Sequence, residues 1–431
     1  MPKISDVLVE RNPWWKGEFE VIFKERELYE KIKKFMGMRQ MIALTGLRRV
    51  GKTTIMLKMA QDAIEGGLPP GNIMYFPFDE FRNIEIRDVV KTYEELLEKD
   101  IRKGRFLIFF DEIQKLSGWE DQLKSLYDSL GESVKIIISG SESLFIKKKS
   151  KETLGGRMFE FKAETLSFAE FLAFRQVKFE PPAIYAKELA NIFVEFSHTH
   201  GFPELAGIKD KEIIKKYIKE SIIDKVVYKD IPKLFKVSDP AIIESLLNIF
   251  MEEPGQLVDL SSLASDLLIT RQTLSKYLSY LEQSFLIKKL YNFSRSRRKT
   301  ERKLKKYYPA IISTELIFKG DDLSKSKVFE WLVVTQLKAE FFWRDPYKNE
   351  VDAILTDGKI TPIEIKYGKI DFTGLVAFMK KFKIYEGFIV SYKIEEKQKI
   401  NGKTISVVPA FKFLLEPSHV SSSFQTPQQP V

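Results

Sequence analysis

The sequence contains no cysteine and only three histidines among its 431 residues. Without cysteine, the chain has no disulfide, no thiol nucleophile and no cysteine-ligated zinc site. Two of the histidines, His198 and His200, lie close together, but no further cluster of metal ligands is near them in the sequence. We therefore interpret them as part of a loop after a helix and not as metal ligands.

Long apolar segments are absent as well. No run approaches the roughly 18 apolar residues that a transmembrane helix needs, and the N-terminus lacks the apolar region of a signal peptide. These absences predict a cytoplasmic protein with no membrane partner. The formal net charge of +10 favours an anionic partner, with nucleic acid first, although a lysine-rich protein without such a partner would have the same balance.

A phosphate-binding motif is present near the N-terminus. Residues 41–44 form a short apolar run of the kind found in buried strands. Residues 46–53, GLRRVGKT, fit the pattern G-x-x-x-x-G-K-[ST]. From Thr54 onward, apolar residues recur at the spacing of a helix packed on a sheet. The motif therefore lies between a predicted strand and a predicted helix, as a phosphate loop requires.

The residue types of this loop suit a nucleoside triphosphate with Mg²⁺. Gly46 and Gly51 permit positive φ and a close approach of the backbone to phosphate, and the amides at the start of the helix attract an anion. Lys52 can reach the β- and γ-phosphates, and the hydroxyl of Thr53 can ligate Mg²⁺. The residues expected to contact ATP in this loop are Gly46, Arg48, Arg49, Val50, Gly51, Lys52, Thr53 and Thr54.

Residues 106–110 predict a second buried strand, which delivers Asp111 and Glu112 at its end. Asp111 is expected to hold Mg²⁺, and Glu112 is expected to act as the general base for the attacking water. Without the upstream phosphate loop, the same sequence would fit two solvated acids at the end of a strand equally well.

Two further segments supply candidates for the same site. The predicted strand at residues 134–138 ends at Ser139, and either Ser139 or Ser141 can face the γ-phosphate or the water; a plain turn fits equally well. Arg157 follows two glycines and is a candidate arginine finger or phosphate sensor, acting in cis or in trans. A surface arginine is the alternative.

These features resemble the AAA+-type ATPases, specifically the archaeal and bacterial group related to the signal-transduction ATPases. The resemblance rests on the loop at 46–53, the strand that ends in Asp111 and Glu112, and the phrases LGGR at 154–157 and LSFAEFL at 166–172. It implies ATP binding and an α/β fold with a helical lid. The alternation of buried strands and helices independently predicts a three-layer parallel α/β domain.

Residues 239–306 predict a winged helix-turn-helix, with helices at 241–250, 260–268 and 272–283. A basic run at 294–306 would form the wing tip and contact DNA phosphates. A module that contacts only proteins is the alternative. The residues expected on the outer, major-groove face of the third helix are Arg271, Gln272, Ser275, Lys276 and Ser279.

Residues 307–416 contain a second candidate active site. Glu364 and Lys366 are two apart on a predicted strand, so they share a face, and Asp352 lies on a neighbouring strand. One or two acids and a lysine can bind Mg²⁺ and activate water. The pattern resembles the PD-(D/E)xK nuclease fold, with Asp352, Glu364 and Lys366 on its motif positions, Asp352 and Glu364 as metal ligands, and Glu330 on the preceding helix. The motif's proline does not precede Asp352.

The whole order resembles widespread ATP-binding proteins with a C-terminal domain of unknown function. We expect an ATPase that couples nucleotide state to binding or processing of double-stranded DNA. The alternative is a nucleotide-dependent switch that binds a protein partner or itself and carries an inactive nuclease-like domain. The predicted segments are 1–39 (N-terminal preface), 40–164 (ATPase core), 165–238 (helical lid), 239–306 (winged helix), 307–416 (restriction-endonuclease-like α/β domain) and 417–431 (disordered tail).

Overall fold

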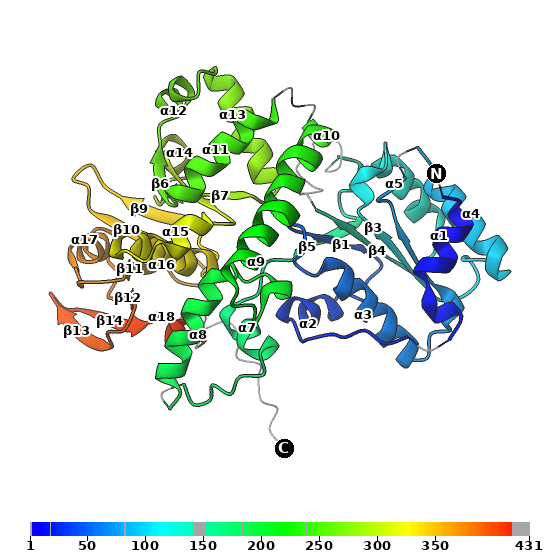
Figure 1. The fold of residues 1–431 in the computed structure, drawn as a ribbon, viewed down its shortest axis with the longest axis horizontal. Coiled ribbons are helices and arrows are strands. Elements are labelled where there is room, and N and C mark those ends of the chain that lie inside the picture. Colours follow the sequence, from blue (N-terminus) through cyan, green and yellow to red (C-terminus); the bar gives the residue numbers. More distant parts are fainter. Residues whose placement is uncertain are drawn as a thin grey trace. The chain divides into compact units, whose positions relative to one another are not determined.

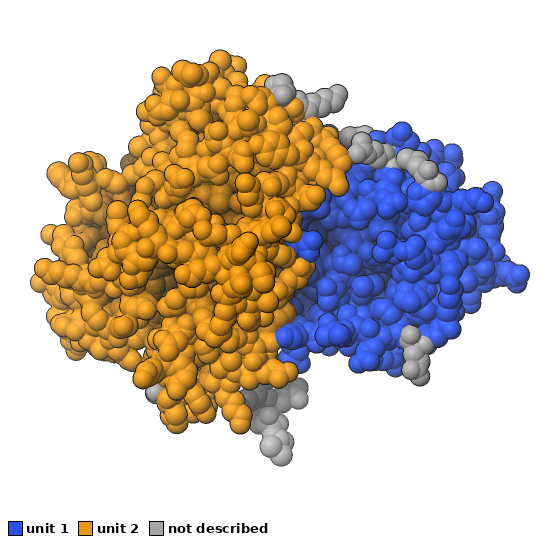
Figure 2. Space-filling model, in the orientation of Figure 1, with its two compact units in different colours: residues 1–165, 283–285 blue, residues 166–282, 286–431 orange. Residues whose placement is uncertain are grey.

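The computed structural model describes residues 2–17, 19–81, 83–141, 152–182, 184–235, 237 and 239–415 (Figure 1). The chain divides into two compact units, coloured separately in Figure 2. Unit 1 consists of residues 1–165 and 283–285, and unit 2 of residues 166–282 and 286–431. The segment 417–431, expected to be a disordered tail, lies outside the described residues.

Unit 1 is built on a five-stranded sheet in the order β2-β3-β4-β1-β5, in which every pair of neighbours is parallel. The apolar runs at 41–44, 106–110 and 134–138 all lie in strands of this sheet, so these predicted strands and the α/β class of this unit are confirmed. The strands are β1 (Met41–Thr45), β2 (Ile73–Pro77), β3 (Phe106–Asp111), β4 (Val134–Gly140) and β5 (Met158–Lys162).

Helices cover both faces of this sheet (Figure 1), because successive strand residues point to opposite sides. On one side, Met74 and Phe76 pack with residues of α1 (Ile4–Arg11), α4 (Ile86–Leu97) and α5 (Trp119–Ser129). On the other side, Ile73 and Tyr75 pack with residues of α2 (Glu27–Lys33) and α3 (Lys52–Glu65). The result is the predicted three-layer arrangement.

The sequence predicts a helix over residues 19–35, but α2 begins only at Glu27 and ends at Lys33. The preceding backbone is held extended by contacts to other parts of unit 1. The amide of Val21 donates to Gln61 Oε1 at 2.9 Å, and the Arg26 guanidinium donates to the carbonyl of Val50 at 3.1 Å.

Unit 2 begins with helices, as the sequence predicted for residues 165–235. Ser167 and Glu170 form a reciprocal capping box at the start of the first helix, which fixes where it begins. The helical elements of this part are α7 (Phe168–Phe174), α8 (Ala186–His198), α9 (Lys211–Lys216), the π-helical turns η5 (Tyr217–Ile223) and η6 (Val226–Asp230), and α10 (Ile231–Phe235).

A three-helix module with a small antiparallel sheet follows. Its helices are α11 (Pro240–Glu252), α12 (Leu260–Asp266) and α13 (Arg271–Gln283), and its strands are β6 (Gln256–Val258), β7 (Ile287–Asn292) and β8 (Lys305–Pro309). The strands pair in the order β6-β8-β7.

One expectation for the module is wrong. Part of the expected wing tip is the short helix α14 (Arg297–Arg302), and Lys306 is a buried residue of β8. Lys306 is therefore not available to contact DNA phosphates.

The sheet of this module continues into the C-terminal part of the chain. β7 pairs in parallel with β9 (Phe341–Arg344), and the full order is β13-β14-β12-β11-β10-β9-β7-β8-β6. The remaining strands are β10 (Glu350–Leu355), β11 (Thr361–Lys366), β12 (Glu386–Ser391), β13 (Glu396–Ile400) and β14 (Lys403–Pro409).

Two apolar clusters fill the two sides of this C-terminal sheet. One cluster includes Phe329 and Leu332 of α16 (Asp322–Gln336) together with Ala353 and Ile363 of the sheet. The other includes Phe378 of α17 (Thr373–Phe382). The sequence predicts a helix at 328–341, whereas α16 begins at Asp322 and ends at Gln336. Two short helices complete the unit, α15 (Thr314–Lys319) and α18 (Ala410–Leu415).

No helix in the described part of the chain is both long enough and apolar enough to cross a membrane.

His200, in the loop after α8, is a buried packing residue. Its ring packs edge-on against Trp331 of α16, and its Nε2 lies 3.0 Å from the carbonyl oxygen of Ile312. Burial lowers the pKa of His200 to about 4, because the charged ring would lose its hydration. Neutral His200 is therefore part of the folded state of unit 2.

This pKa predicts a pH dependence of stability. Between pH 6.5 and about 4, the unfolded chain binds a proton that folded His200 excludes, so the free energy of unfolding falls as pH falls. Lowering the pH to 5 removes roughly 2 kcal/mol from this source. His200→Gln, which keeps a side-chain amide for Ile312, should lose correspondingly less stability than the wild type in urea unfolding followed by tryptophan fluorescence. Equal losses in both proteins would contradict the assignment.

Candidate functional site

The phosphate-loop motif lies between β1 and α3 as predicted. Gly51 is the residue before α3 and has a φ of 91°, and Arg49 has a φ of 60°. Gly46 has a φ of 141°, and a Cβ at this position would lie 2.1 Å from the carbonyl oxygen of Ala163. Gly46 is therefore required by the close approach of the segment after β5 as well as by its own backbone conformation.

The Lys52 side chain lies along the loop. Its ammonium donates to the carbonyl oxygens of Gly46 and Leu47 at 2.9 and 3.0 Å, and the residue is buried. These contacts hold a full positive charge at the loop, where a phosphate would meet it.

Asp111, at the end of β3, joins four elements of unit 1. Its Oδ2 accepts hydrogen bonds from Thr53 Oγ1 at 2.7 Å and from the Tyr75 hydroxyl at 2.6 Å. Its Oδ1 accepts from Ser139 Oγ and from the amide of Glu112. The carboxylate is thus fixed by α3, β2 and β4 at the carboxyl ends of parallel strands.

Glu112 is held beside Asp111 in a left-handed conformation, with a φ of 51°. Its Oε2 accepts from Gln114 Nε2 at 2.6 Å and from Ser141 Oγ at 3.0 Å. Burial alone would raise the pKa of Glu112, but the positive charges of Lys52 and Lys115 outweigh it and hold the pKa below its usual value. Glu112 is therefore ionised at neutral pH, as a proton acceptor must be.

The other predicted residues of the loop have different surroundings. Val50 is buried and its carbonyl accepts from Arg26, whereas Arg49 and Thr54 are exposed and Arg48 is partly exposed. Arg157 pairs with Asp128 of α5 through two hydrogen bonds of 2.9 and 3.2 Å. The finger or sensor role of Arg157 stays a prediction.

Three residues of this site were not identified from the sequence: Tyr75, Gln114 and Arg26. Arg26 donates to the carbonyls of Val50 and Glu164 and so ties the loop to the segment after β5. None of the three belongs to a motif. Gln114 follows Glu112 by two residues, whereas Tyr75 on β2 and Arg26 ahead of α2 reach the site only through the fold. The sequence gives no signal for Tyr75 beyond its place in an apolar segment.

Thr53 and Asp111 fit a Mg²⁺ ion by the chemistry of their donors. A hydroxyl and a carboxylate lie in direct contact at the phosphate loop, and both are oxygen ligands of the kind that Mg²⁺ takes beside nucleotide phosphates.

Unit 2 contains the second predicted group of residues. Asp352 of β10 and Glu364 of β11 are both buried, and the amide of Ile365 donates to Asp352 Oδ2 at 2.8 Å. Lys366 pairs with Glu364 Oε1 at 2.6 Å.

Lys306 of β8 enters the same group, which the sequence did not indicate. Its Nζ lies 2.5 Å from Glu350 Oε1, 3.7 Å from Glu330 Oε1 and 3.8 Å from Asp352 Oδ1. Tyr308, two residues further along β8, donates its hydroxyl to Glu330 Oε1 at 2.7 Å. We call Lys306, Glu330, Glu350, Asp352, Glu364 and Lys366 the carboxylate–lysine cluster.

Burial dominates the electrostatics of this cluster. It raises the pKa of Asp352 to about 6, with the charge of Glu330 adding to the rise. It also raises the pKa of Glu364 well above the usual value, with Asp352 contributing. Burial alone would lower the pKa of Lys306, but Tyr308 and the surrounding carboxylates keep it raised.

The cluster does not fit a Mg²⁺ ion. Both oxygens of Asp352 face donors, namely the Ile365 amide and Lys306, and one oxygen of Glu364 is paired with Lys366. Within the described residues, no group of three or more His, Cys, Asp or Glu side chains is arranged to hold a metal ion.

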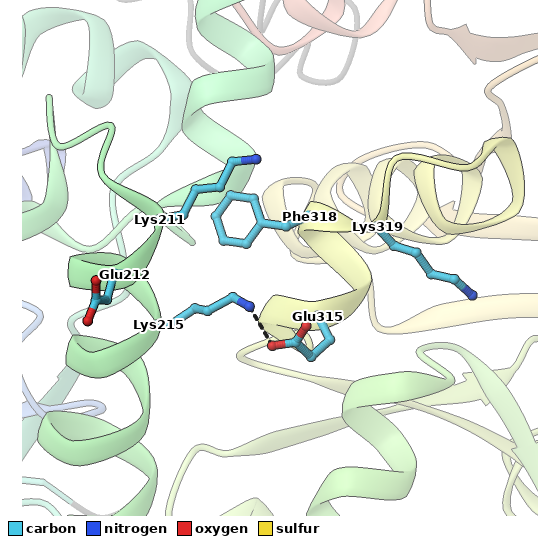
Figure 3. A pocket seen from close by; sticks show the side chains of 6 residues that line it. All are labelled: Lys211, Glu212, Lys215, Glu315, Phe318 and Lys319. Carbon is cyan, nitrogen blue, oxygen red and sulfur yellow. Dashed lines mark hydrogen bonds and ion pairs between the residues drawn. The ribbon is translucent and has the colours of Figure 1, made fainter.

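A hollow of about 600 Å³ lies elsewhere on unit 2, between α9 and α15 (Figure 3). Lys211 and Lys215 lie over the ring of Phe318, and Lys215 pairs with Glu315 at 2.6 Å. None of the predicted site residues lines this hollow, and each of its three lysines contacts another protein group.

Comparison with known proteins finds relatives in bacteria and archaea. A protein of Haemophilus influenzae, described as uncharacterized, is 28% identical over 253 residues, or 57% of this chain and 61% of that protein. A Methanocaldococcus jannaschii protein of the same description is 25% identical over 426 residues, or 90% and 88%. A second one is 30% identical over 257 residues, or 58% and 56%. This chain thus covers less than two thirds of the first and third of these relatives.

Solved structures give only distant matches. The Aeropyrum pernix Orc1 protein in complex with DNA is 15% identical and has a TM-score of 0.32, covering 76% of this chain and 98% of that one. The AMPPCP-bound DnaA of Aquifex aeolicus is 17% identical, with a TM-score of 0.28 and coverage of 61% and 89%. Scores this low do not establish a common fold.

Family models match three parts of the chain. Residues 193–310 and 326–413 match two domains of unknown function, DUF8612 and DUF4143. Residues 38–172 match an AAA domain. This match covers the phosphate loop, Asp111, Glu112 and the parallel sheet of unit 1, so this part of the chain is similar to AAA domains.

Proposed function

We propose that unit 1 binds and hydrolyses ATP. The observation that carries this proposal is the convergence of Lys52, Thr53, Asp111 and Glu112 at the carboxyl ends of β1 and β3. Two of these residues come from the phosphate loop and its helix, and two come from a strand about sixty residues later. A chance match to the loop pattern would not bring the acid pair to the same place.

Each side chain has a distinct part in this proposal. The loop amides and Lys52 bind the phosphates, and Lys52 neutralises charge that develops during transfer. Thr53 and Asp111 would hold Mg²⁺, which lowers the negative charge of the phosphates when it is bound. Glu112, kept ionised by Lys52 and Lys115, takes up the proton of the attacking water. Ser139 fixes Asp111, and Ser141 and Gln114 fix Glu112.

We further propose that the three-helix module of unit 2 binds DNA. Its order of helices and strands is that of a winged helix-turn-helix. Leu274, Leu278 and Leu281 of α13 are buried, while four of the predicted contact residues are exposed and Ser279 is partly exposed. The exposed ones are Arg271, Gln272, Ser275 and Lys276.

Exposed positive charge on another element of the same module supports DNA as the ligand. Arg297, Arg298 and Lys299 are exposed on the short helix α14. Arg295 is exposed too, and it donates to the carbonyl of Phe382. Phosphate contacts from such residues hold a protein on DNA irrespective of base sequence.

The role of the C-terminal part separates two candidate functions. The succession α16, β9, β10, β11, α17 and β12, with Asp352, Glu364 and Lys366 on β10 and β11, supports the likeness to PD-(D/E)xK nucleases and hence DNA processing. The position of Lys306 among the carboxylates favours the other candidate. That candidate is a nucleotide-dependent switch that binds a protein partner or another copy of itself, with a nuclease-like part that does not cleave.

Removing the loop lysine tests the first proposal. Lys52→Ala should lower ATP turnover by about 10²- to 10³-fold, because a charge on the phosphates is lost. Lys58→Ala is the matched control, since Lys58 lies on the same helix and pairs with Asp62. Phosphate release is the measurement. Glu112→Gln should still bind ATP while losing turnover, and unchanged turnover in Lys52→Ala would refute the proposal.

Neutralising the outer face of α13 tests DNA binding. Each lost phosphate contact should reduce the slope of log K against log salt by about 1, so Arg271→Ala with Lys276→Ala should reduce it by about 2. Fluorescence anisotropy with duplex DNA over a range of KCl concentrations gives this slope. Lys397→Ala with Lys399→Ala, on exposed β13, should leave it unchanged. A slope that does not differ between the two double variants would exclude the α13 face.

A cleavage assay separates DNA processing from the switch. A nuclease should degrade duplex DNA only when Mg²⁺ is present, and the activity should vanish in Glu364→Ala and in Lys366→Ala. The switch predicts slow ATP turnover that does not respond to DNA and no degradation by any of the three proteins. Gel electrophoresis of labelled duplex, run on the preparation used for phosphate release, provides the measurement.

A further inference from the structure

The carboxylate–lysine cluster has an unusual composition for a buried site. Four of its side chains are acids, and they come from α16, β10 and β11. Lys306 comes from β8, which belongs to the three-helix module. In the order of the sheet, β7 and β9 lie between β8 and β10, so the contacts of Lys306 with Glu350 and Asp352 join strands that are not neighbours.

The contacts of Lys306 are those of a cation held by several anions at once. Its ammonium is in direct contact with Glu350 and within 3.8 Å of Glu330 and Asp352. The same ammonium nitrogen lies 5.5 Å from the centre of the Phe342 ring on β9. The side chain is 6% exposed. A position this buried and this surrounded by carboxylate oxygens attracts a cation.

The charges of the cluster are nearly balanced by protein groups. Three cations lie within 3.0 Å of an acid: Lys306 and Arg344 on Glu350, and Lys366 on Glu364. They face four carboxyl groups, those of Glu330, Glu350, Asp352 and Glu364. A divalent ion entering beside Lys306 would give the cluster an excess of positive charge next to the buried side chains of Lys306 and Asp352, where repulsion between like charges is stronger than in water.

We infer that Lys306 is the resident cation of this cluster, and that its ammonium takes the place of a divalent metal ion and excludes one. The cluster is then a structural junction that ties β8 of the three-helix module to α16 and β10. Tyr308, on the same face of β8 as Lys306, adds a second tie through its hydrogen bond to Glu330.

The inference does not rest on nucleotide turnover by unit 1, so the two can fail separately. The full chain is tested with Asp111→Asn as background and without nucleotide, which removes the expected metal site of unit 1. Binding of Mn²⁺ is followed by electron paramagnetic resonance, which distinguishes free from bound ions, and by the midpoint of thermal unfolding.

In this background the chain with Lys306 should bind no Mn²⁺. Lys306→Met should lower the midpoint of unfolding, because Glu330, Glu350 and Asp352 then repel one another. It should also bind about one equivalent of Mn²⁺, and the ion should raise the midpoint by about 5 °C. The matched control is Lys305→Met, on the opposite face of β8. This variant should neither lower the midpoint of unfolding nor bind Mn²⁺.

Two results would overturn the inference. One is Mn²⁺ binding by the background chain that disappears when Asp352→Asn is added. The other is a folded Lys306→Met variant that gains no Mn²⁺. If Lys306→Met does not fold, the comparison of the background chain with Asp352→Asn still decides the question, since it requires no change at Lys306.

Discussion

The carboxylate of Asp111 is the point on which the order of unit 1 depends. It accepts hydrogen bonds from Thr53, Tyr75 and Ser139, and so joins α3, β2 and β4 to the end of β3. A buried carboxylate is tolerated only where its oxygens are satisfied, and four donors satisfy this one. The same bonds place the Thr53 hydroxyl beside the Asp111 carboxylate. The geometry that stabilises the carboxyl ends of these strands is therefore also the geometry that the proposed chemistry needs.

Unit 1 was predictable from the sequence to a large extent, because its signals are local. The apolar runs that become β1 to β5 are bounded by glycines and polar residues, and the phosphate loop is contiguous. The partners of Asp111 and Glu112 were less accessible. Tyr75 and Gln114 are ordinary residues in sequence. The parallel pairing of β2 with β3 brings Tyr75 to Asp111, and the short turn after Glu112 brings Gln114 back to that acid. The length of α2 was missed because tertiary contacts of Val21 and Arg26 override local helix propensity.

In unit 2, the sequence does not predict which charged side chains are buried. Lys306 belongs to the densest run of positive charge in the chain, and such runs are normally solvated. Alternation along β8 turns Lys306 inward while Lys305 is partly exposed, so two neighbouring lysines have opposite environments. The acids that contact Lys306 lie between 24 and 46 residues away in sequence. No regular spacing between them and Lys306 predicts these contacts. The resemblance to PD-(D/E)xK nucleases pointed to Asp352, Glu364 and Lys366, and it gave no indication that Lys306 lies beside these acids.

The pairing of β7 with β9 has a consequence for how such chains evolve. Tyr291 and Asn292 pair with Phe341 and Phe342, so the three-helix module and the C-terminal part share one ladder of backbone hydrogen bonds. A recombination event between residues 306 and 307 would leave β9 without its neighbour and would separate Lys306 from the acids it neutralises. We expect these two parts to be inherited as a block, with ancestral exchange of modules confined to junctions outside residues 239–415.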